Sequence, residues 1–257
     1  MDKKLNVAVI FGGKSGEHEV SLMSATNVIK AMDKDKYNIY MIGINKQGRW
    51  MEYKGDVNDI QDGSWESQVA EESRAETVAL LFSGLFKSKS KGTDDAINSS
   101  QIDVIFPVLH GPNGEDGTVQ GLFQLLDIPY VGCGVLASAL GMDKALSKQI
   151  FKSVGLSVGQ YSVLLKKEIK EAIDKVSDQI EADFQYPVFI KPANMGSSVG
   201  ITKAHNREGL QKGLLDACSF DRKIIIEASI NGRELECAVL GNDSPKASGV
   251  GEIIPSH

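Results

Sequence analysis

The stretch LNVAVIFGGKSGEHEVSLMSATNVIKAMDKDKYNIYMIGIN, residues 5–45, contains the pattern that decides the fold. Residues 5–11 form a β-rich apolar run, residues 20–32 are apolar at helical spacing, and residues 37–45 are strand-like again. A strand–helix–strand order of this kind predicts a parallel, doubly wound α/β sheet. Ligands of such sheets bind at the carboxyl ends of the strands.

The alternation continues with a predicted strand over 102–111 and a helix over 117–128. Residues 51–100 are polar and rich in serine, and we expect them to be surface elaboration. After Met142 the pattern changes to a predicted α+β unit that begins with an amphipathic helix over 143–156. We therefore predict a domain boundary near Met142, with Asp143 as the N-cap of that helix.

Composition narrows the class of protein. The 257 residues are 42% hydrophobic and 24% charged, with a net charge of −6, which disfavours nucleic-acid or anionic-membrane partners. No apolar run is long enough for a spanning helix. The first apolar run enters Gly12-Gly13 rather than a cleavage site, so we expect no signal peptide. Three cysteines without metal-ligand spacing suit a reducing, cytoplasmic environment.

Two polar segments follow predicted strand ends in the first half. Gly13-Lys14-Ser15 is not a P-loop, because Ala8 occupies the position that the motif requires to be glycine. The turn instead offers Glu17 and helix amides to a ligand, the alternative being an ordinary strand-to-helix turn with an acidic cap. His110 follows the second strand and would share a crevice with Glu17 if the strands are parallel neighbours, the alternative being a structural histidine.

Two further segments lie in the second half. Lys191 ends an apolar strand, so its ammonium group should pair with an anion, and Gly196-Ser197-Ser198 offers backbone amides as a phosphate-covering loop does. The alternative is a hairpin with a solvent-reaching lysine, but the presence of Lys144 favours phosphate. KIIIEASINGRELECAVLG, residues 223–241, would form an edge for an adenine ring, or else a hairpin with surface acids.

Four segments together resemble the D-alanine–D-alanine ligase family of the ATP-grasp superfamily. They are GGKSGEHEVSLMSA (12–25), PVLHGPNGEDGTVQGLFQLLDIPYVGCGVLASALGMDK (107–144), IKPANMGSSVGITKA (190–204) and IIIEASINGRELECAVLG (224–241). The resemblance implies three parts: an N-terminal substrate-side domain at 1–142, a first ATP-grasp lobe at 143–230, and the start of the C-terminal lobe at 231–257. The second lobe would then be mostly missing.

The implied reaction is the ATP-driven joining of two D-alanines for peptidoglycan precursor synthesis. One D-alanine carboxylate takes the γ-phosphoryl group of ATP, and the amine of the second D-alanine attacks the acyl phosphate. A D-alanine–D-lactate or D-alanine–D-serine ligase shares these segments. A non-catalytic nucleotide-binding fragment that engages a partner through its open sheet is the alternative from another class.

The resemblance also implies roles for individual residues. Glu17 and Ser197 would be catalytic: Glu17 would bind the ammonium group of the first D-alanine, near His110, and Ser197 would position Glu17. Nucleotide-binding roles fall on the remaining candidates. These are Lys144 and Lys191 on the phosphates, Ser197 and Ser198 in the covering loop, Glu227, Ala228 and Ile230 around adenine, and Glu234 on the ribose hydroxyls.

The family pattern continues for roughly a hundred residues past His257, where the magnesium ligands are expected, so none is assigned here. We therefore expect a truncated chain with little turnover and weak ATP affinity. Residues 231–257 would be strands with open edges that are prone to association. Family members are typically homodimers through the N-terminal domain, and we expect the same partner here, together with ATP and D-alanine.

Overall fold

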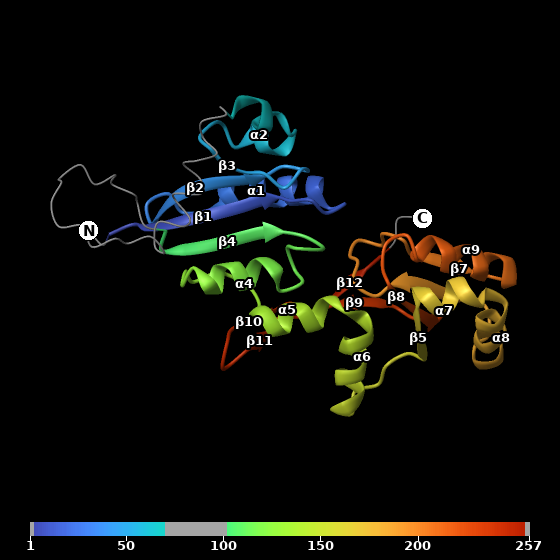
Figure 1. Cartoon of the computed structure of the whole chain (residues 1–257). Helices are drawn as coiled ribbons and strands as arrows, with labels where there is room; N and C mark the ends of the chain where they lie inside the picture. The colour runs from blue at the N-terminus through green and yellow to red at the C-terminus, as the bar shows by residue number, and fades with distance from the viewer. Residues whose placement is uncertain (1–2, 70–101, 255–257) are drawn as a thin grey trace.

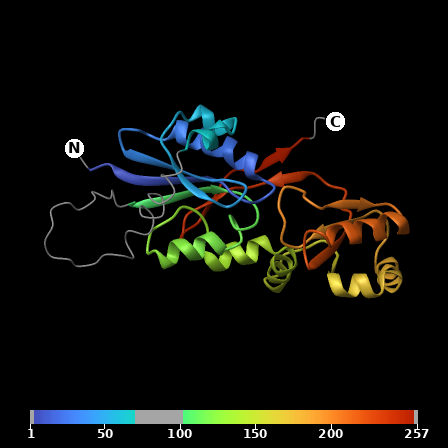
Figure 2. The same ribbon diagram turned by 45° about the horizontal axis from the view of Figure 1, so that its top comes forward.

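The computed structural model describes residues 3–69 and 102–254 and arranges them around two main sheets, between which two helices run (Figures 1 and 2). The first sheet has the order β3-β2-β1-β4. Its strands are β1 (Leu5–Gly12), β2 (Tyr37–Ile44), β3 (Trp50–Tyr53) and β4 (Val104–Leu109). β1 pairs in parallel with both β2 and β4, and β3 joins the far edge of β2 in antiparallel fashion. The predicted parallel sheet is confirmed, with one antiparallel edge strand added.

Helices cover both faces of this sheet. Alternate residues of β1 point to opposite faces, so Val7 and Phe11 pack in the core beneath α1 (His18–Ala31). Ala8 and Ile10 pack in a second core with α4 (Thr118–Leu125). A strand buried on both sides is mainly apolar, which explains why six of the seven residues over 5–11 are apolar, with Asn6 as the exception. The doubly wound architecture is therefore confirmed.

The segment that follows β2 corrects one expectation. Residues 51–69 are not mere surface elaboration: they form β3, α2 (Asn58–Gln61) and the 3-10 helix η1 (Ser64–Gln68). Trp65 of η1 is 1% exposed, and its ring meets that of Phe11 edge-on at a centroid distance of 5.1 Å. This segment completes the first core. The remainder of the range given that role, 70–100, lies outside the described residues.

The second main sheet has the order β5-β8-β6-β7 and is antiparallel throughout. Its strands are β5 (Tyr161–Leu165), β6 (Val188–Pro192), β7 (Thr202–Ala204) and β8 (Lys223–Ala228). The helices α7 (Lys166–Glu171), α8 (Ile173–Asp183) and α9 (Arg207–Ala217) share a core with one face of the sheet. α7 and α8 are two helices rather than one, because the backbone at Ala172 turns to φ −151°, ψ 53° between them.

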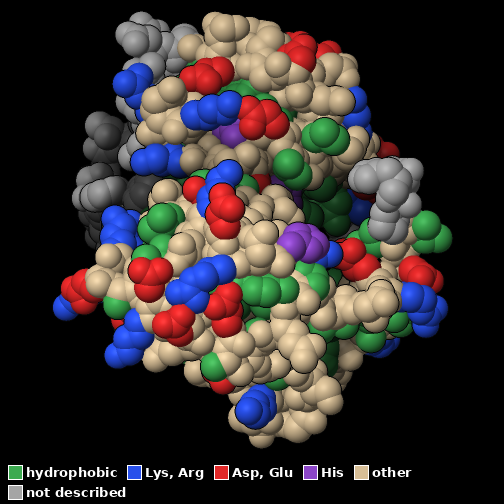
Figure 3. Space-filling model, turned by 90° about the vertical axis from the view of Figure 1, so that its right-hand side faces the viewer, with side chains coloured by type: hydrophobic (Ala, Val, Ile, Leu, Met, Phe, Trp, Pro, Cys, Tyr) green, Lys and Arg blue, Asp and Glu red, His purple; other side chains and the backbone are tan. Residues whose placement is uncertain are grey.

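The outer surface of these helices carries mixed charge. Arg207 lies 2.7 Å from an Asp178 oxygen and 2.6 Å from a Glu181 oxygen, which links α9 to α8. Figure 3, which looks onto this end of the molecule, shows acidic and basic side chains interspersed. Mixed charge suits a solvated face rather than a polyanion-binding one.

Asp143 joins α5 (Val135–Met142) to α6 (Lys144–Ser153), and it is the predicted N-cap. Its Oδ1 accepts hydrogen bonds from the Ala145 and Leu146 amides, 3.1 Å each, and its Oδ2 pairs with Lys223 on β8. Burial alone raises the pKa of Asp143, but the hydrogen bonds from Lys223 and the amides bring it below the ordinary value. One carboxylate therefore both starts α6 and fixes it to the second sheet.

We expect Asp143→Ala to lower the free energy of unfolding by about 1–2 kcal/mol through loss of the cap, with a further loss from the unpaired Lys223. Asp143→Asn keeps an oxygen for the amides and loses only the ion pair, so it should cost less. Urea unfolding followed by circular dichroism measures both. Equal losses in the two variants would show that the cap contributes nothing.

The last described residues form two small ribbons outside the main sheets. β9 (Glu234–Glu236) pairs with β12 (Gly251–Ile253), and β10 (Val239–Leu240) pairs with β11 (Lys246–Ala247). Every residue over 231–254 is exposed. The open strand edges expected here are present within the described part of the chain, and their tendency to associate stays a prediction. Within residues 3–69 and 102–254, every helix is too short or too polar to cross a bilayer.

Candidate functional site

The carboxyl ends of β1 and β4 bring two candidates to one edge of the first sheet. Glu17 lies at the start of α1 and is 7% exposed, and His110 directly follows β4. Because β1 and β4 are parallel neighbours, both loops leave the sheet at the same edge. Gly111 packs against the Glu17 carboxylate so closely that a Cβ there would lie 2.1 Å from Oε2. Glu17 and His110 therefore lie at the same edge of the first sheet, as predicted for parallel neighbouring strands.

The loop between β6 and β7 reaches this carboxylate from the second sheet. The Ser197 hydroxyl donates a hydrogen bond to Glu17 Oε1, although the two residues are 180 apart in the sequence. Ser197 and Ser198 both have positive φ, 41° and 60°, and the Ile201 amide donates to the Ser198 carbonyl at 3.2 Å. The hydrogen bond expected between Ser197 and Glu17 is present, whereas the contact expected between Ser198 and phosphate stays a prediction.

His110 has an acidic neighbour in the loop after β4. Its Nδ1 lies 3.5 Å from Glu115 Oε1, and its Nε2 lies 3.4 Å from the Ser24 hydroxyl. The hydrogen bond that His110 donates to Glu115 raises the pKa of His110 above its ordinary 6.5, against an opposing effect of burial. The same contact lowers the pKa of Glu115. The pair is charged on both sides between the pKa of Glu115 and the raised pKa of His110.

This pair predicts a pH dependence. A histidine with a raised pKa contributes stability that is complete below its unfolded value and is lost as pH rises through the folded value. For Glu115 the contribution is lost as pH falls. We expect Glu115→Gln to move the pKa of His110 downward, as measured by an NMR titration of the imidazole Cε1 proton. An unchanged titration curve would show that Glu115 does not act on His110.

Lys144 of α6 and Lys191 of β6 lie close enough for their charges to interact. The Lys144 ammonium donates to the Met195 carbonyl, and its backbone amide donates to the Ala193 carbonyl at 3.0 Å. Burial lowers the pKa of Lys144, and the nearby Lys191 charge lowers it further. Repulsion between two ammonium groups below a glycine–serine loop is the arrangement that an added anion would relieve.

Two lysine side chains bind Glu227, and this pairing was not predicted from the sequence. Glu227 lies near the end of β8, where Lys191 pairs with its Oε2 and Lys148 lies 2.8 Å from its Oε1. Lys148 was not identified from the sequence. Its signal was its position one helical turn after Lys144, which puts both ammonium groups on the same side of α6.

The other adenine and ribose candidates lie further along the chain. Ala228 ends β8, and its amide donates to the Gln160 carbonyl at 3.0 Å. Ile230 is 73% exposed, close to Gly159. Glu234 begins the exposed strand β9, where it pairs with Ile253. Within the described residues no hydrogen bond or ion pair connects the Glu234 side chain to Glu227 or the lysines, so its ribose role stays a prediction.

Two family models match this chain. The model described as "D-ala D-ala ligase N-terminus" matches residues 6–133, and "D-ala D-ala ligase C-terminus" matches residues 150–257. The chain belongs to the D-alanine–D-alanine ligase family. The four sequence segments that resemble this family therefore predicted the family of the chain correctly. The two matches together cover almost the whole sequence.

Individual proteins that are similar to this chain support the same family assignment. A curated D-alanine–D-alanine ligase from Acetivibrio thermocellus is 51% identical over 265 residues, which cover 100% of this chain and 70% of that protein. Among solved structures, the VanG D-Ala:D-Ser ligase from Enterococcus faecalis has 36% identity and a TM-score of 0.79, covering 97% of this chain and 70% of that one. The D-alanine–D-alanine ligase from Coxiella burnetii has 31% identity and a TM-score of 0.80, covering 98% and 71%.

The ligase site has two distinct environments. At the first sheet, a cavity of about 290 Å³ adjoins His110 and is lined by the Gly12–Ser15 loop and by residues 112–114. At the second sheet, Lys144, Lys148 and Lys191 gather around Glu227. Clustered ammonium groups suit a polyphosphate. Within the described residues, no group of three His, Cys, Asp or Glu side chains is placed to hold a metal ion.

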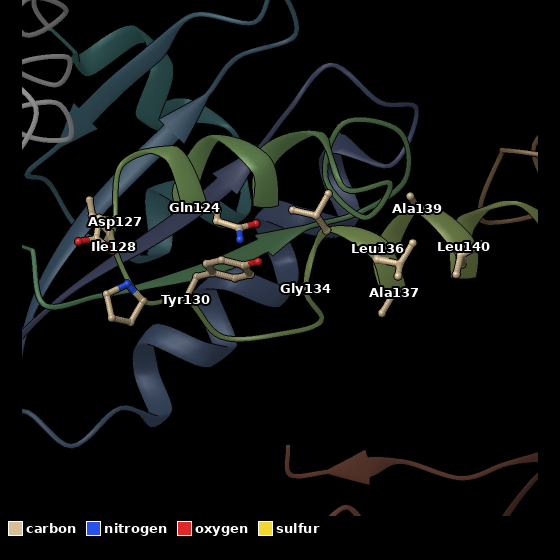
Figure 4. Close-up of a pocket in the computed structure, with 11 residues that line it drawn as sticks. Gln124, Asp127, Ile128, Tyr130, Gly134, Leu136, Ala137, Ala139 and Leu140 are labelled. Atoms are coloured by element: carbon tan, nitrogen blue, oxygen red, sulfur yellow. The ribbon is translucent and has the colours of Figure 1, made fainter. Parts of the chain in front are cut away.

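A larger hollow lies apart from these residues. It has a volume of about 1000 Å³ and is lined mainly by apolar side chains between the end of α4 and α5. Figure 4 shows Gln124 and Tyr130 at one end and Leu136 and Leu140 at the other. None of the candidate catalytic or nucleotide-binding residues lines it, so it is not part of the ligase site described above.

Proposed function

We propose that this chain serves the ATP-dependent ligation of two D-alanines to D-alanyl-D-alanine, a precursor of peptidoglycan. The observation that carries the proposal is the hydrogen bond from Ser197 to Glu17. It brings the glycine–serine loop of the second sheet onto a buried carboxylate of the first sheet. A phosphate-covering loop and an ammonium-binding acid therefore meet at one place, as transfer of a phosphoryl group to an amino acid requires.

The proposed roles follow from this geometry. Glu17 binds the ammonium group of the first D-alanine, and His110, close beside it and partly exposed, contacts the same substrate. Lys144 and Lys191 neutralise the phosphates of ATP, while backbone amides around Ser197 and Ser198 cover them. Transfer of the γ-phosphoryl group to the carboxylate yields an acyl phosphate and ADP. The amine of the second D-alanine then displaces phosphate and forms the peptide bond.

We also propose how the adenosine part of ATP is bound, which metal ion takes part, and where and in what oligomeric state the protein acts. Glu227, Ala228 and Ile230 surround adenine, and Glu234 binds the ribose. Mg²⁺ accompanies ATP, because phosphoryl transfer commonly uses a metal ion to neutralise the developing charge. We propose a cytoplasmic homodimer, which fits the net charge of −6 and a composition suited to a reducing compartment.

Formation of dipeptide from D-alanine and ATP tests the proposal. Radiolabelled D-alanine is incubated with the full-length ligase that contains residues 1–257, ATP and Mg²⁺, alone or together with D-serine or D-lactate, and the products are separated by chromatography. D-alanyl-D-alanine is expected as the main product. Preferential formation of the mixed product with D-serine or D-lactate would contradict the proposed specificity. Calorimetric titration with ATP reports the nucleotide site independently of turnover, and absence of ATP binding would contradict that site.

A further inference from the structure

The face of the second sheet that points away from α7, α8 and α9 carries an ordered cross-strand row. The register pairs Tyr161 of β5 with Glu227 of β8, and Glu227 with Phe189 of β6. Directly paired residues in adjacent strands point to the same face. Val188 and Ile190 alternate with Phe189 and belong to the helix-covered core. Glu227 therefore lies between two aromatic rings on the opposite face.

Each ring is accompanied by a lysine that also binds Glu227. Lys148 lies 5.5 Å from the Tyr161 ring centroid, and Lys191 lies 5.4 Å from the Phe189 ring centroid. Lys148 contacts Oε1 of Glu227 at 2.8 Å, whereas Lys191 contacts Oε2. The Glu227 side chain is only 13% exposed. The two oxygens of one mostly buried carboxylate are thus held by two different ammonium groups.

The two lysines are not equivalent. The charge of Lys191 lowers the pKa of Lys144, and these two lysines are the proposed phosphate-binding pair. Lys148 stands on the other side of Glu227, over Tyr161. Burial alone raises the pKa of Glu227, and the hydrogen bonds from Lys148 and Lys191 bring it below its ordinary value. When Lys191 turns to a phosphate, only Lys148 remains to stabilise the buried charge.

We infer that Lys148 is a positioning residue of the nucleotide site, which holds the Glu227 carboxylate ionised and oriented towards the adenine amine while Lys191 engages the phosphates. The inference rests on the proposed nucleotide site. A carboxylate accepts hydrogen bonds from the 6-amino group of adenine and repels the 6-oxo group of hypoxanthine. Lys148 therefore supports discrimination between ATP and inosine triphosphate without contacting either base.

The test compares the affinities for ATP and inosine triphosphate, measured by calorimetry on the full chain. Lys148→Met is expected to weaken ATP binding about tenfold, the size expected for loss of a charge-assisted hydrogen bond, and to leave inosine triphosphate binding nearly unchanged. The preference for ATP then falls by the same factor. Lys148→Arg should restore it. Lys152→Met, at an exposed site one turn further along α6, is the matched control and should leave both affinities as they are.

Other outcomes would overturn the inference. Equal weakening of both nucleotides by Lys148→Met would mean that Lys148 acts on the phosphates or on the fold. In a Glu227→Gln background, Lys148→Met should no longer change the preference, and a persisting change would show that Lys148 does not act through Glu227. If the unaltered chain discriminates between the nucleotides and Lys148→Met keeps that discrimination, only the role of Lys148 is wrong. If the unaltered chain binds no ATP, the proposed nucleotide site is wrong as well.

Discussion

Replacing Glu17 by glutamine is expected to reduce the affinity for D-alanine, and kcat/KM for dipeptide formation, by about a hundredfold. The glutamine oxygen still accepts the hydrogen bond from Ser197, so the loop stays in place. What disappears is the negative charge opposite the substrate ammonium group. Loss of a charge-assisted contact at a site that is 7% exposed costs about 2–3 kcal/mol, which corresponds to that factor.

The neighbouring Glu19 offers a matched control. It lies on the same helix two residues further on, and its side chain is 65% exposed and paired with Lys46. Glu19→Gln should therefore leave D-alanine binding unchanged. Titration of D-alanine in the presence of a non-hydrolysable ATP analogue measures both variants independently of turnover. Equal affinities in Glu17→Gln and the unaltered protein would exclude Glu17 as the ammonium-binding acid.

Replacing Trp65 by alanine is expected to lower the free energy of unfolding of the first unit by about 3–5 kcal/mol, the range for a fully buried large aromatic residue. Trp65 packs edge-on against Phe11 at 5.1 Å and against Tyr53 at 6.2 Å. Its ring also lies directly on β2, where a Cβ at Gly43 would be 2.2 Å from Trp65 Cζ3. No neighbouring side chain can fill the volume without moving the 3-10 helix.

Two further variants test whether the loss of stability in Trp65→Ala comes from the burial of its ring. Trp50→Ala removes the same residue type at a partly exposed position of β3, so its cost should be smaller. Trp65→Phe keeps an aromatic ring and should fall between the two alanine variants. Guanidinium unfolding followed by far-ultraviolet circular dichroism measures all three without depending on tryptophan emission. A Trp65→Ala midpoint equal to that of Trp50→Ala would show that η1 is not part of the cooperative core.

The strands and the common sheet edge of Glu17 and His110 were predictable because each depends on a local pattern. The mainly apolar residues over 5–11 reflect burial on both faces, and parallel pairing then places the next residues at one edge. Trp65 was missed because its segment has few apolar residues and lacks a helical or strand period. The break at Ala172 has no local signal either, since alanine favours helix continuation.

Lys148 shows a different limit of sequence reasoning. A lysine on an amphipathic helix normally faces solvent, and its partner Glu227 belongs to a strand far along the chain. Only the packing of α6 against the second sheet reveals that the Lys148 side chain is 21% exposed and that its ammonium group is bound to a carboxylate. The same packing explains why Glu227, predicted from the family resemblance to face adenine, is held between two cations.

The central position of β1 has a consequence for how the protein is made. Val7 pairs with Ile39 on one side but with Val104 on the other. As the nascent chain leaves the ribosome, one edge of β1 stays without its partner until β4 has been synthesised, roughly 5–20 s at ordinary elongation rates. In the second sheet β5 also waits for its partner β8, but the intervening stretch, from Leu165 to Lys223, is shorter than that from Gly12 to Val104. We therefore expect chaperones to act mainly on the N-terminal half of this polypeptide.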